Sequence, residues 1–532
     1  MLVQPFISMA VLVAGLLVDS TWAKGTRVPL PPSVQRRYEA HYEAMAAKRA
    51  TPQVFDTKDF RFLSNKTSPY RVESLPDVDF DIGEMYSGLV PIESKNKSRE
   101  LFFVFQPTIG APVDEITIWL NGGPGCSSLE GFLQENGRFV WQSGTFAPVE
   151  NPYSWVNLTN MLWVDQPVGT GFSTGTPTAI SEEDIAQDFV GFFKNFEILF
   201  GIKKFKIYVT GESYAGRYVP YISAAFIDQN DTEYFDLKGA MVYDPVIGAY
   251  TTAQEEVPTY PLVEANNNLF NFNETQLATL KELHQSCGYE AYLEKYLTFP
   301  ASGVQPVLEE ANSTCDILDL ALEYALGINP CFSIYEISTS CPLQWDVLGF
   351  PGSLSYLPAG ATIYFDRADV KKALHAPPNT TWTECAGNVF VGGNSGPEGL
   401  GDLSLDPIQH ALPKVIEHTN RVLVSNGDYD MIIQTNGTLL AIQNMTWHGT
   451  LGFNERPSKE IYIHTPDLVY PAQFNESGYT GSDGPQGTMG IQHFERGLMW
   501  AQTYQSGHMQ PEYQPRVSLR HLEWLLGRVD EL

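Results

Sequence analysis

The sequence predicts an α/β protein with a mostly parallel central sheet flanked by helices. Between residues 115 and 243, short apolar segments rich in β-branched residues alternate with helical segments, a pattern typical of parallel sheets. Similar strand segments return at residues 421–425 and 497–504. Hydrophobic residues form 43% of the 532-residue chain and aromatic residues form 12%, so a large core can form.

The charge balance limits the classes of partner. The chain carries 33 basic and 62 acidic residues, a formal net charge of −29. Such a surface repels nucleic acids and anionic membranes, so neither is expected as a partner. Acidic surroundings would bring the chain closer to neutrality.

The first 23 residues predict a cleaved signal peptide. Their apolar segment, residues 7–18, is shorter than the roughly 20 residues of a membrane span, and it is followed by Thr21-Trp22-Ala23, with small residues where signal peptidase cuts. No later apolar run is long enough to span a membrane. Six cysteines and ten N-x-S/T sequons also indicate secretion, either to the extracellular space or to a vacuole or lysosome-like compartment. The candidate glycosylation sites are Asn65, Asn96, Asn157, Asn230, Asn273, Asn312, Asn379, Asn436, Asn444 and Asn475.

The remaining chain divides into three parts. Residues 24–55, with several prolines and a basic stretch, are either a removable propeptide or an N-terminal arm. Residues 56–247 and 363–532 are expected to build one body. Residues 248–362 interrupt the strand alternation, and their cysteines predict a disulfide-stapled cap insertion over the sheet edge. These cysteines allow three pairings, which the sequence leaves open: Cys287, Cys315, Cys331 and Cys341.

Secondary structure in the first half of the body follows from local patterns. Residues 80–92 and 101–106 predict antiparallel strands that open the sheet. Ser181 and Asp184 are expected to cap a helix that ends at Gly201. The further predicted strands are residues 115–120, 161–164, 204–211 and 240–243.

A glycine-rich loop follows the strand at residues 115–120. It reads Asn121-Gly122-Gly123-Pro124-Gly125-Cys126, which excludes regular structure and exposes backbone amides. Such amides can bind a phosphate or an oxyanion. The loop lacks the Lys-Ser/Thr ending of a P-loop, and this argues for the oxyanion.

Ser213 is the candidate nucleophile. It stands in Gly211-Glu212-Ser213-Tyr214-Ala215, where an apolar strand ends and an apolar helix begins. This is close to the G-x-S-x-G nucleophile elbow, with Ala215 in place of the last glycine. A serine in such a turn can also be a plain helix cap, so the interpretation needs a base and an orienting acid elsewhere in the chain.

Both partners follow the strands that return late in the chain. The first strand runs into Asn426-Gly427-Asp428-Tyr429-Asp430, and the second into Gly507-His508-Met509. Taken singly, an aspartate in such a turn or a histidine after glycine is usually structural. The order Ser, Asp, His at three strand ends is the order of an α/β-hydrolase fold, which we therefore predict.

Five segments together resemble the serine carboxypeptidase family, over about residues 75–526. They are residues 119–128, 165–173 and 211–216, Asn426-Gly427-Asp428-Tyr429-Asp430, and Gly507-His508-Met509. The resemblance implies a serine-type carboxypeptidase that releases single C-terminal amino acids from peptides at acidic pH through an acyl-enzyme. It implies no cofactor and no metal, and peptide or protein C-termini as substrates.

Residue roles follow from the resemblance alone. It implies a triad of Ser213, His508 and Asp430, with Asp428 structural, and an oxyanion hole formed by the amides of Gly123 and Tyr214. The other implied roles are a site for the substrate carboxylate (Asn121, Gly122, Glu135 and Glu212), a pocket for the leaving residue (Ile433 and Met509) and a Cys126–Cys385 disulfide. Two positions depart from the family pattern: Ile433 replaces a frequent cysteine, and Gln510 replaces the valine of Gly-His-Met-Val-Pro.

Three alternative functions are less consistent with these residues. An acyltransferase or esterase would use the same triad, but Glu212 before the nucleophile favours a peptidase, since the family's acyltransferases tend to have aspartate there. A non-catalytic binding homologue is disfavoured by the intact triad pattern. A zinc carboxypeptidase is unsupported because none of the ten histidines begins an H-x-x-E or H-E-x-x-H pattern.

Overall fold

The structure is a computed structural model that describes residues 60–308, 315–349, 356–357, 360–393, 400–463 and 487–532. The predicted signal peptide and the predicted propeptide or arm lie outside these residues, as do Asn312 and Asn475. The boundaries proposed for these segments, and those of the cap and body, stay predictions.

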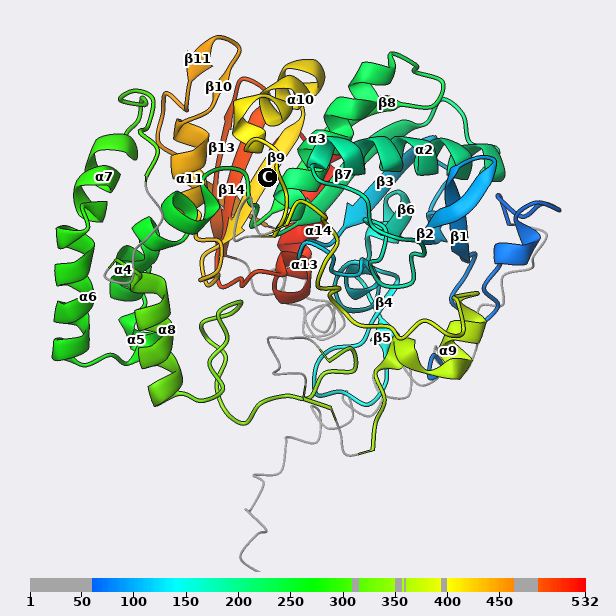
Figure 1. The fold of residues 1–532 in the computed structure, drawn as a ribbon, viewed down its shortest axis with the longest axis horizontal. Helices are drawn as coiled ribbons and strands as arrows, with labels where there is room; N and C mark the ends of the chain where they lie inside the picture. Colours follow the sequence, from blue (N-terminus) through cyan, green and yellow to red (C-terminus); the bar gives the residue numbers. More distant parts are fainter. Residues whose placement is uncertain (1–59, 309–314, 350–355, 358–359, 394–399, 464–486) are drawn as a thin grey trace, which may run out of the picture. The chain divides into compact units, whose positions relative to one another are not determined.

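The centre of the fold is a ten-stranded sheet in the order β1-β2-β6-β3-β7-β8-β9-β14-β13-β12. The strands in the middle of the sheet run parallel to one another: β6, β3, β7, β8, β9 and β14. Antiparallel strands complete both edges. This confirms the predicted α/β fold with a mostly parallel sheet (Figure 1). The strands are β1 (Tyr86–Glu93), β2 (Asn96–Gln106), β3 (Glu115–Leu120), β6 (Asn160–Asp165), β7 (Lys206–Glu212), β8 (Asp236–Tyr243), β9 (Val422–Gly427), β12 (Lys459–Tyr462), β13 (Thr488–Glu495) and β14 (Leu498–Thr503).

Two hydrophobic cores cover the two faces of the sheet. Side chains alternate along a strand, so Ile207 and Val209 of β7 pack in one core while Tyr208 packs in the other. The first core includes phenylalanines of α2 (Glu182–Phe200) and α3 (Ala215–Gln229), together with residues of α10 (Ala411–Thr419). The second includes α14 (Pro515–Leu525). The predicted helical layers are therefore present.

The helix α2 begins differently from the prediction. Ser181 occupies the N-cap position but makes no side-chain capping bond. Instead, Asp184 Oδ2 accepts a hydrogen bond from the Ile180 N–H at 3.0 Å, so this carboxylate fixes the backbone just before the helix and does not cap a helical amide. The helix ends at Gly201, whose φ of 69° is left-handed, as a C-terminal glycine allows.

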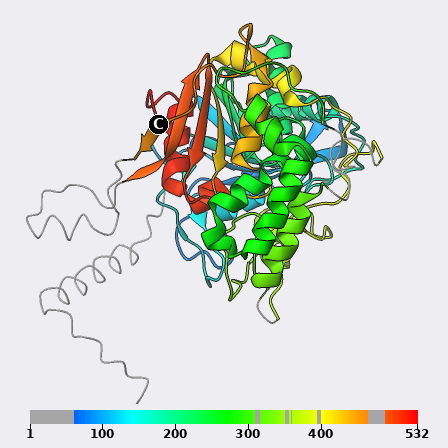
Figure 2. The same ribbon diagram turned by 90° about the vertical axis from the view of Figure 1, so that its left-hand side faces the viewer.

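The predicted cap insertion contains helices with their own core. They are α4 (Glu256–Ala265), α5 (Asn267–Phe270), α6 (Glu274–Ser286), α7 (Tyr289–Tyr296) and α8 (Ile317–Ile328). Disulfides join Cys287 to Cys315 and Cys331 to Cys341, which decides the pairing that the sequence left open. The helices lie together beside α11 (Thr435–Gln443), as Figures 1 and 2 show.

Short elements complete the described fold. They are α9 (Ala368–Ala373), α13 (Gln510–Tyr513), β4 (Phe139–Val140), β5 (Val149–Glu150), β10 (Thr446–Trp447) and β11 (Thr450–Leu451). Among the described helices, none combines the length and the apolar character that a membrane crossing requires.

Candidate active site

Ser213 stands at a sharp turn between β7 and α3. Its φ of 62° is left-handed, which is unusual for a residue other than glycine and is typical of functional turns. The Ser213 N–H donates to the Tyr243 carbonyl at 2.9 Å, and its carbonyl accepts from the Val246 N–H at 3.1 Å. A Cβ on Gly216 would lie 2.6 Å from Val246 N, so this glycine permits the close approach. The serine side chain is half-buried and accessible.

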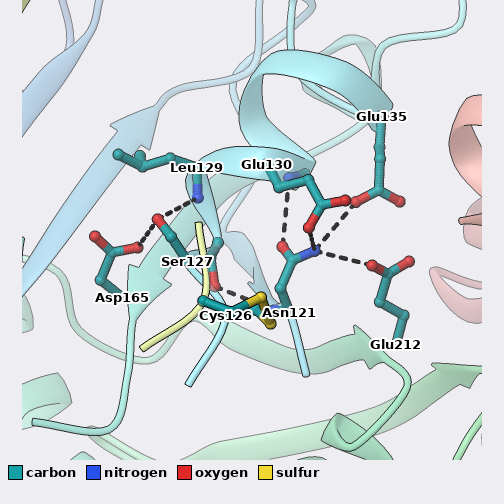
Figure 3. The surroundings of a disulfide bond; sticks show 11 residues. Asn121, Cys126, Ser127, Leu129, Glu130, Glu135, Asp165 and Glu212 are labelled. Atoms are coloured by element: carbon teal, nitrogen blue, oxygen red, sulfur yellow. Dashed lines mark hydrogen bonds between the residues drawn. A yellow bond between two sulfur atoms is a disulfide. The ribbon is translucent and has the colours of Figure 1, made fainter. Parts of the chain in front are cut away.

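The glycine-rich loop packs directly on this turn. A Cβ on Gly122 would lie 2.5 Å from Tyr214 N and 2.7 Å from Ser213 Cβ. Gly123 follows with a left-handed φ of 108°. The Cys126–Cys385 disulfide holds the end of the loop, as Figure 3 shows. The amides expected to form the oxyanion hole, those of Gly123 and Tyr214, therefore belong to two segments in contact beside the serine.

His508 and Asp430 form a buried pair. The Nδ1 of His508 donates to Asp430 Oδ2 at 2.7 Å, and Asp430 Oδ1 accepts from the Ile432 N–H at 2.8 Å. Nε2 of His508 is buried and has no hydrogen-bond partner among the described residues. No hydrogen bond joins it to Ser213 in this described part of the chain. An imidazole held at Nδ1 with Nε2 available is the arrangement of a general base.

The other acid of the turn, Asp428, has a different role. Its Oδ1 accepts from the Gln505 N–H at 2.6 Å and from the Ser506 N–H at 3.4 Å. These bonds fasten the loop that carries His508 to the turn that carries Asp430. Burial raises the pKa of Asp428 to about 6.

The cap insertion also contacts His508, which the sequence analysis did not foresee. The His508 N–H donates to the Tyr335 carbonyl at 2.8 Å, and the two rings lie 5.4 Å apart. Main-chain bonds from Ile337 to Tyr429 and from Met431 to Ile334 join the same cap segment to the acid turn. No local motif marks Tyr335, since only the folded chain brings it there.

Asn121 brings the carboxylates together (Figure 3). Its Nδ2 donates to Glu212 Oε1 at 2.9 Å, to Glu130 Oε2 at 3.1 Å and, more weakly, to Glu135 Oε1 at 3.4 Å. Its Oδ1 accepts from Trp119 Nε1 at 2.8 Å, which fixes the orientation of the amide. Asn121, Glu135 and Glu212, the residues expected at a substrate-carboxylate site, thus lie together, with Glu212 directly before Ser213, and Glu130 joins them.

The surroundings of these carboxyl groups favour their neutral forms. Burial raises the pKa of Glu135 to about 8. The pKa values of Glu212 and Glu130 are both raised well above the ordinary value of a glutamate. Burial is the larger cause, and the charge of Glu135 is the next. One oxygen from each of the three lies within 4.8 Å of the others. Three such carboxylates resemble a metal site, but the Asn121 amide donates into the space between them, where a cation would lie.

Glu130 was missed by the sequence analysis. It precedes Glu135 by five residues, and both belong to the turn around the π-helix η4 (Gly131–Glu135). Burial and the charge of Glu130 also raise the pKa of the neighbouring Glu384, which lies next to Cys385. No spacing rule marks these residues as one cluster, because a sharp turn and a distant segment bring them together.

Ile433 and Met509, expected at the pocket for the leaving residue, are both buried. Ile433 packs against Val246 and Tyr250, and Met509 immediately precedes α13. Their role at the leaving residue stays a prediction.

The unusual Gln510 is part of a buried polar network. Its Nε2 donates to Asp244 Oδ2 at 2.6 Å, and its Oε1 accepts from Ser425 at 2.8 Å and from Thr503 at 2.9 Å. Asp244 Oδ1 in turn accepts from the Gly427 N–H at 2.8 Å. A valine could make none of these bonds, so Gln510 joins the ends of β8, β9 and β14 in this chain.

A serine at a strained strand-to-helix turn, with a His–Asp pair at the same edge of a mostly parallel sheet, is typical of α/β-hydrolases. The family model described as serine carboxypeptidase matches residues 76–528. The chain therefore belongs to the serine carboxypeptidase family, and the predicted enzyme class, a serine-type carboxypeptidase, is confirmed.

Individual relatives agree with this family. The chain is 64% identical to the serine-type carboxypeptidase F of Aspergillus niger, over the full length of both chains. It is 45% identical to a probable serine carboxypeptidase of Arthroderma benhamiae, over 91% of each chain. A crystal structure of a prohormone-processing carboxypeptidase from Saccharomyces cerevisiae shares the fold, with a TM-score of 0.65 and 24% identity over 87% of this chain and 96% of that one.

Proposed function

We propose that the protein removes single amino acids from the free C-termini of peptides and proteins at acidic pH. The observation that carries this proposal is that Glu135 and Glu212 both accept hydrogen bonds from the side-chain amide of Asn121. Glu212 directly precedes Ser213. A neutral carboxyl group can donate a hydrogen bond to the terminal carboxylate of a substrate, whereas an ionised one repels it. A site of this kind beside the nucleophile selects the last peptide bond of a chain.

The proposed reaction has two steps, acylation of Ser213 and hydrolysis of the acyl-serine, and the same groups act in both. His508 Nε2 takes the proton of Ser213 Oγ while this oxygen attacks the last peptide carbonyl. The amides of Gly123 and Tyr214 donate to the resulting oxyanion. The C–N bond then breaks, the His508 proton passes to the departing amino group, and an acyl-serine remains. Water attacks this ester by the same route, which releases the shortened peptide and restores Ser213. Asp430 orients the imidazole and stabilises its cation.

We further propose that the enzyme is a secreted glycoprotein. Among the described sequons, those with exposed asparagines support glycosylation: Asn65, Asn96, Asn230, Asn273 and Asn379. Removal of N-glycans from the secreted protein should lower its mass, and peptide mapping should identify the occupied sites. The acidic composition supports a working environment at low pH. It also supports peptides as partners rather than nucleic acids or membranes.

The test compares a peptide library with its C-terminally amidated copy at acidic pH, each loss being measured by mass. The wild type should release one residue at a time from the free peptides and far less from the amides. Ser213→Ala should release none. Equal action on both libraries would contradict a carboxylate site. Transfer to an added alcohol at the expense of hydrolysis would instead indicate an acyltransferase.

A further inference from the structure

Tyr214 connects the nucleophile turn to a buried ion pair. Its phenol O–H donates to Asp402 Oδ2 at 2.7 Å. Arg217 Nε donates to the same carboxylate oxygen at 2.8 Å. The Tyr214 side chain is 2% exposed, and those of Asp402 and Arg217 are fully buried. Hydrogen bonds to ionised groups are shorter and stronger than neutral ones, so this is a firm anchor for the Tyr214 ring.

The segment that carries Asp402 is itself held in place. The Ser404 N–H donates to Asp402 Oδ1 at 2.9 Å, and Arg217 Nη2 donates to the Ser404 carbonyl at 3.0 Å. The Glu182 N–H at the start of α2 donates to Ser404 Oγ at 2.6 Å. Segment 402–406 therefore lies between the first turns of α2 and α3, and several hydrogen bonds hold it there.

The backbone of Tyr214 is held from two sides. It follows Ser213, whose φ is left-handed, and precedes Ala215, the first residue of α3. The Tyr214 N–H shares a planar peptide with the Ser213 carbonyl, which accepts from the Gly216 N–H at 2.9 Å and from the Val246 N–H at 3.1 Å. The phenol bond to Asp402 restrains the same residue on the other side of this N–H.

We propose that Asp402 is a positioning residue that acts through the phenol of Tyr214 and holds the Tyr214 N–H where it donates to the oxyanion. The inference rests on the proposed function, since it takes this N–H as an oxyanion donor. Asp402 touches neither the substrate nor the reacting atoms in this scheme. Its effect should therefore appear in the stabilisation of the tetrahedral intermediate and not in substrate binding.

Tyr221 offers a matched control. It lies about two turns further along the chain in α3, is 4% exposed, and its phenol donates to the Leu405 carbonyl at 2.8 Å. Tyr214 and Tyr221 thus bind the same segment with the same group, but only Tyr214 carries a proposed oxyanion donor. Tyr214→Phe and Tyr221→Phe each remove one hydroxyl and keep the ring and the backbone.

The experiment measures kcat and KM of the mature enzyme for a free peptide and for an activated ester, together with inhibition by a peptide aldehyde and by the matching alcohol. Ser213 Oγ adds to the carbonyl carbon of the aldehyde and forms a tetrahedral adduct with an oxyanion. The alcohol binds but does not react. Loss of a whole oxyanion donor costs about 10²–10³ in kcat, so a displaced donor in Tyr214→Phe should cost about tenfold. The KM of Tyr214→Phe should stay within about twofold of wild type. Its affinity for the aldehyde should fall together with kcat, whereas its affinity for the alcohol should not change. Tyr221→Phe should keep wild-type kcat, and its Tm should fall by no more than that of Tyr214→Phe, whose lost bond is to the ion-paired Asp402.

Three results would overturn the positioning role. These are an unchanged kcat in Tyr214→Phe, equal loss of kcat in both variants, or equal weakening of aldehyde and alcohol binding. The ester keeps the two proposals distinguishable, because its hydrolysis needs the oxyanion donors but not the carboxylate site. A wild type that cleaves the ester but removes no C-terminal residue would contradict the proposed function and still test the role of Asp402.

Discussion

The substitution Glu135→Gln tests the link between carboxyl protonation and recognition of the substrate carboxylate. The pKa of Glu135 is raised to about 8, mainly by burial. The wild-type group is therefore neutral at acidic pH and ionises as the pH rises through about 8. Glutamine keeps a hydrogen-bond donor but cannot ionise.

The structure gives the size of the effect. Oxygens of Glu130, Glu135 and Glu212 lie within 4.8 Å of one another, and two unit charges at this distance repel by about 3.5 kcal/mol at an effective dielectric constant of about 20. This repulsion keeps at least one proton in the cluster. A hydrogen bond to a charged group contributes about 1.5–3 kcal/mol, so ionisation of Glu135 should cost at least about tenfold in kcat/KM for a free peptide.

The assay is kcat/KM against pH for a free peptide and its C-terminal amide. In the wild type, the free peptide should lose its advantage over the amide as the pH rises through about 8. In Glu135→Gln the alkaline fall for the free peptide should be smaller, because the glutamine does not ionise.

Glu197→Gln is the control for this experiment. Glu197 lies in α2, outside the site, is fully buried and has a pKa raised to about 9, mainly by burial. Its substitution should leave both pH profiles unchanged. Parallel profiles for the free peptide and the amide in wild type and in Glu135→Gln would refute the reasoning, and carboxylate recognition by the glutamates would be excluded.

Other predictions concern the triad, the thiols and stability. Asp430→Asn should abolish turnover as Ser213→Ala and His508→Ala do, because the three groups work as a unit, whereas Asp428→Asn should retain more activity; the reverse order of the two aspartate variants would contradict the assignment. Thiol titration of the denatured, unreduced protein should find no free cysteine, since all six are paired, and mercurials should barely inhibit the enzyme. Folding favours the neutral form of Glu197, so its contribution to stability is complete below its ordinary pKa and is lost as the pH rises through about 9. Thermal unfolding should accordingly show that Glu197→Gln gains stability relative to wild type at pH 9 and above, but not at pH 4, and an equal Tm difference at both pH values would contradict this.

The sequence alone determined which chemical groups stand at the ends of the strands. The strand β3 begins and ends where the apolar pattern predicts, and Ser213, Asp430 and His508 follow β7, β9 and β14. This succeeded because strand alternation, glycine-rich turns and helix starts are encoded in neighbouring residues. The edge strands β12 and β13 were not predicted, since the pairing of an edge strand depends on its neighbour more than on its own pattern.

Only the tertiary structure decided which distant groups meet. Glu130 joins Glu212 through an amide that is 91 residues from Glu212 in the chain, and the bond between Gln510 and Asp244 spans 266 residues. Sequence spacing carries no information about such contacts. The pKa values of the site depend on them, because burial and the approach of like charges exist only once the sheet, the glycine loop and the cap are packed together.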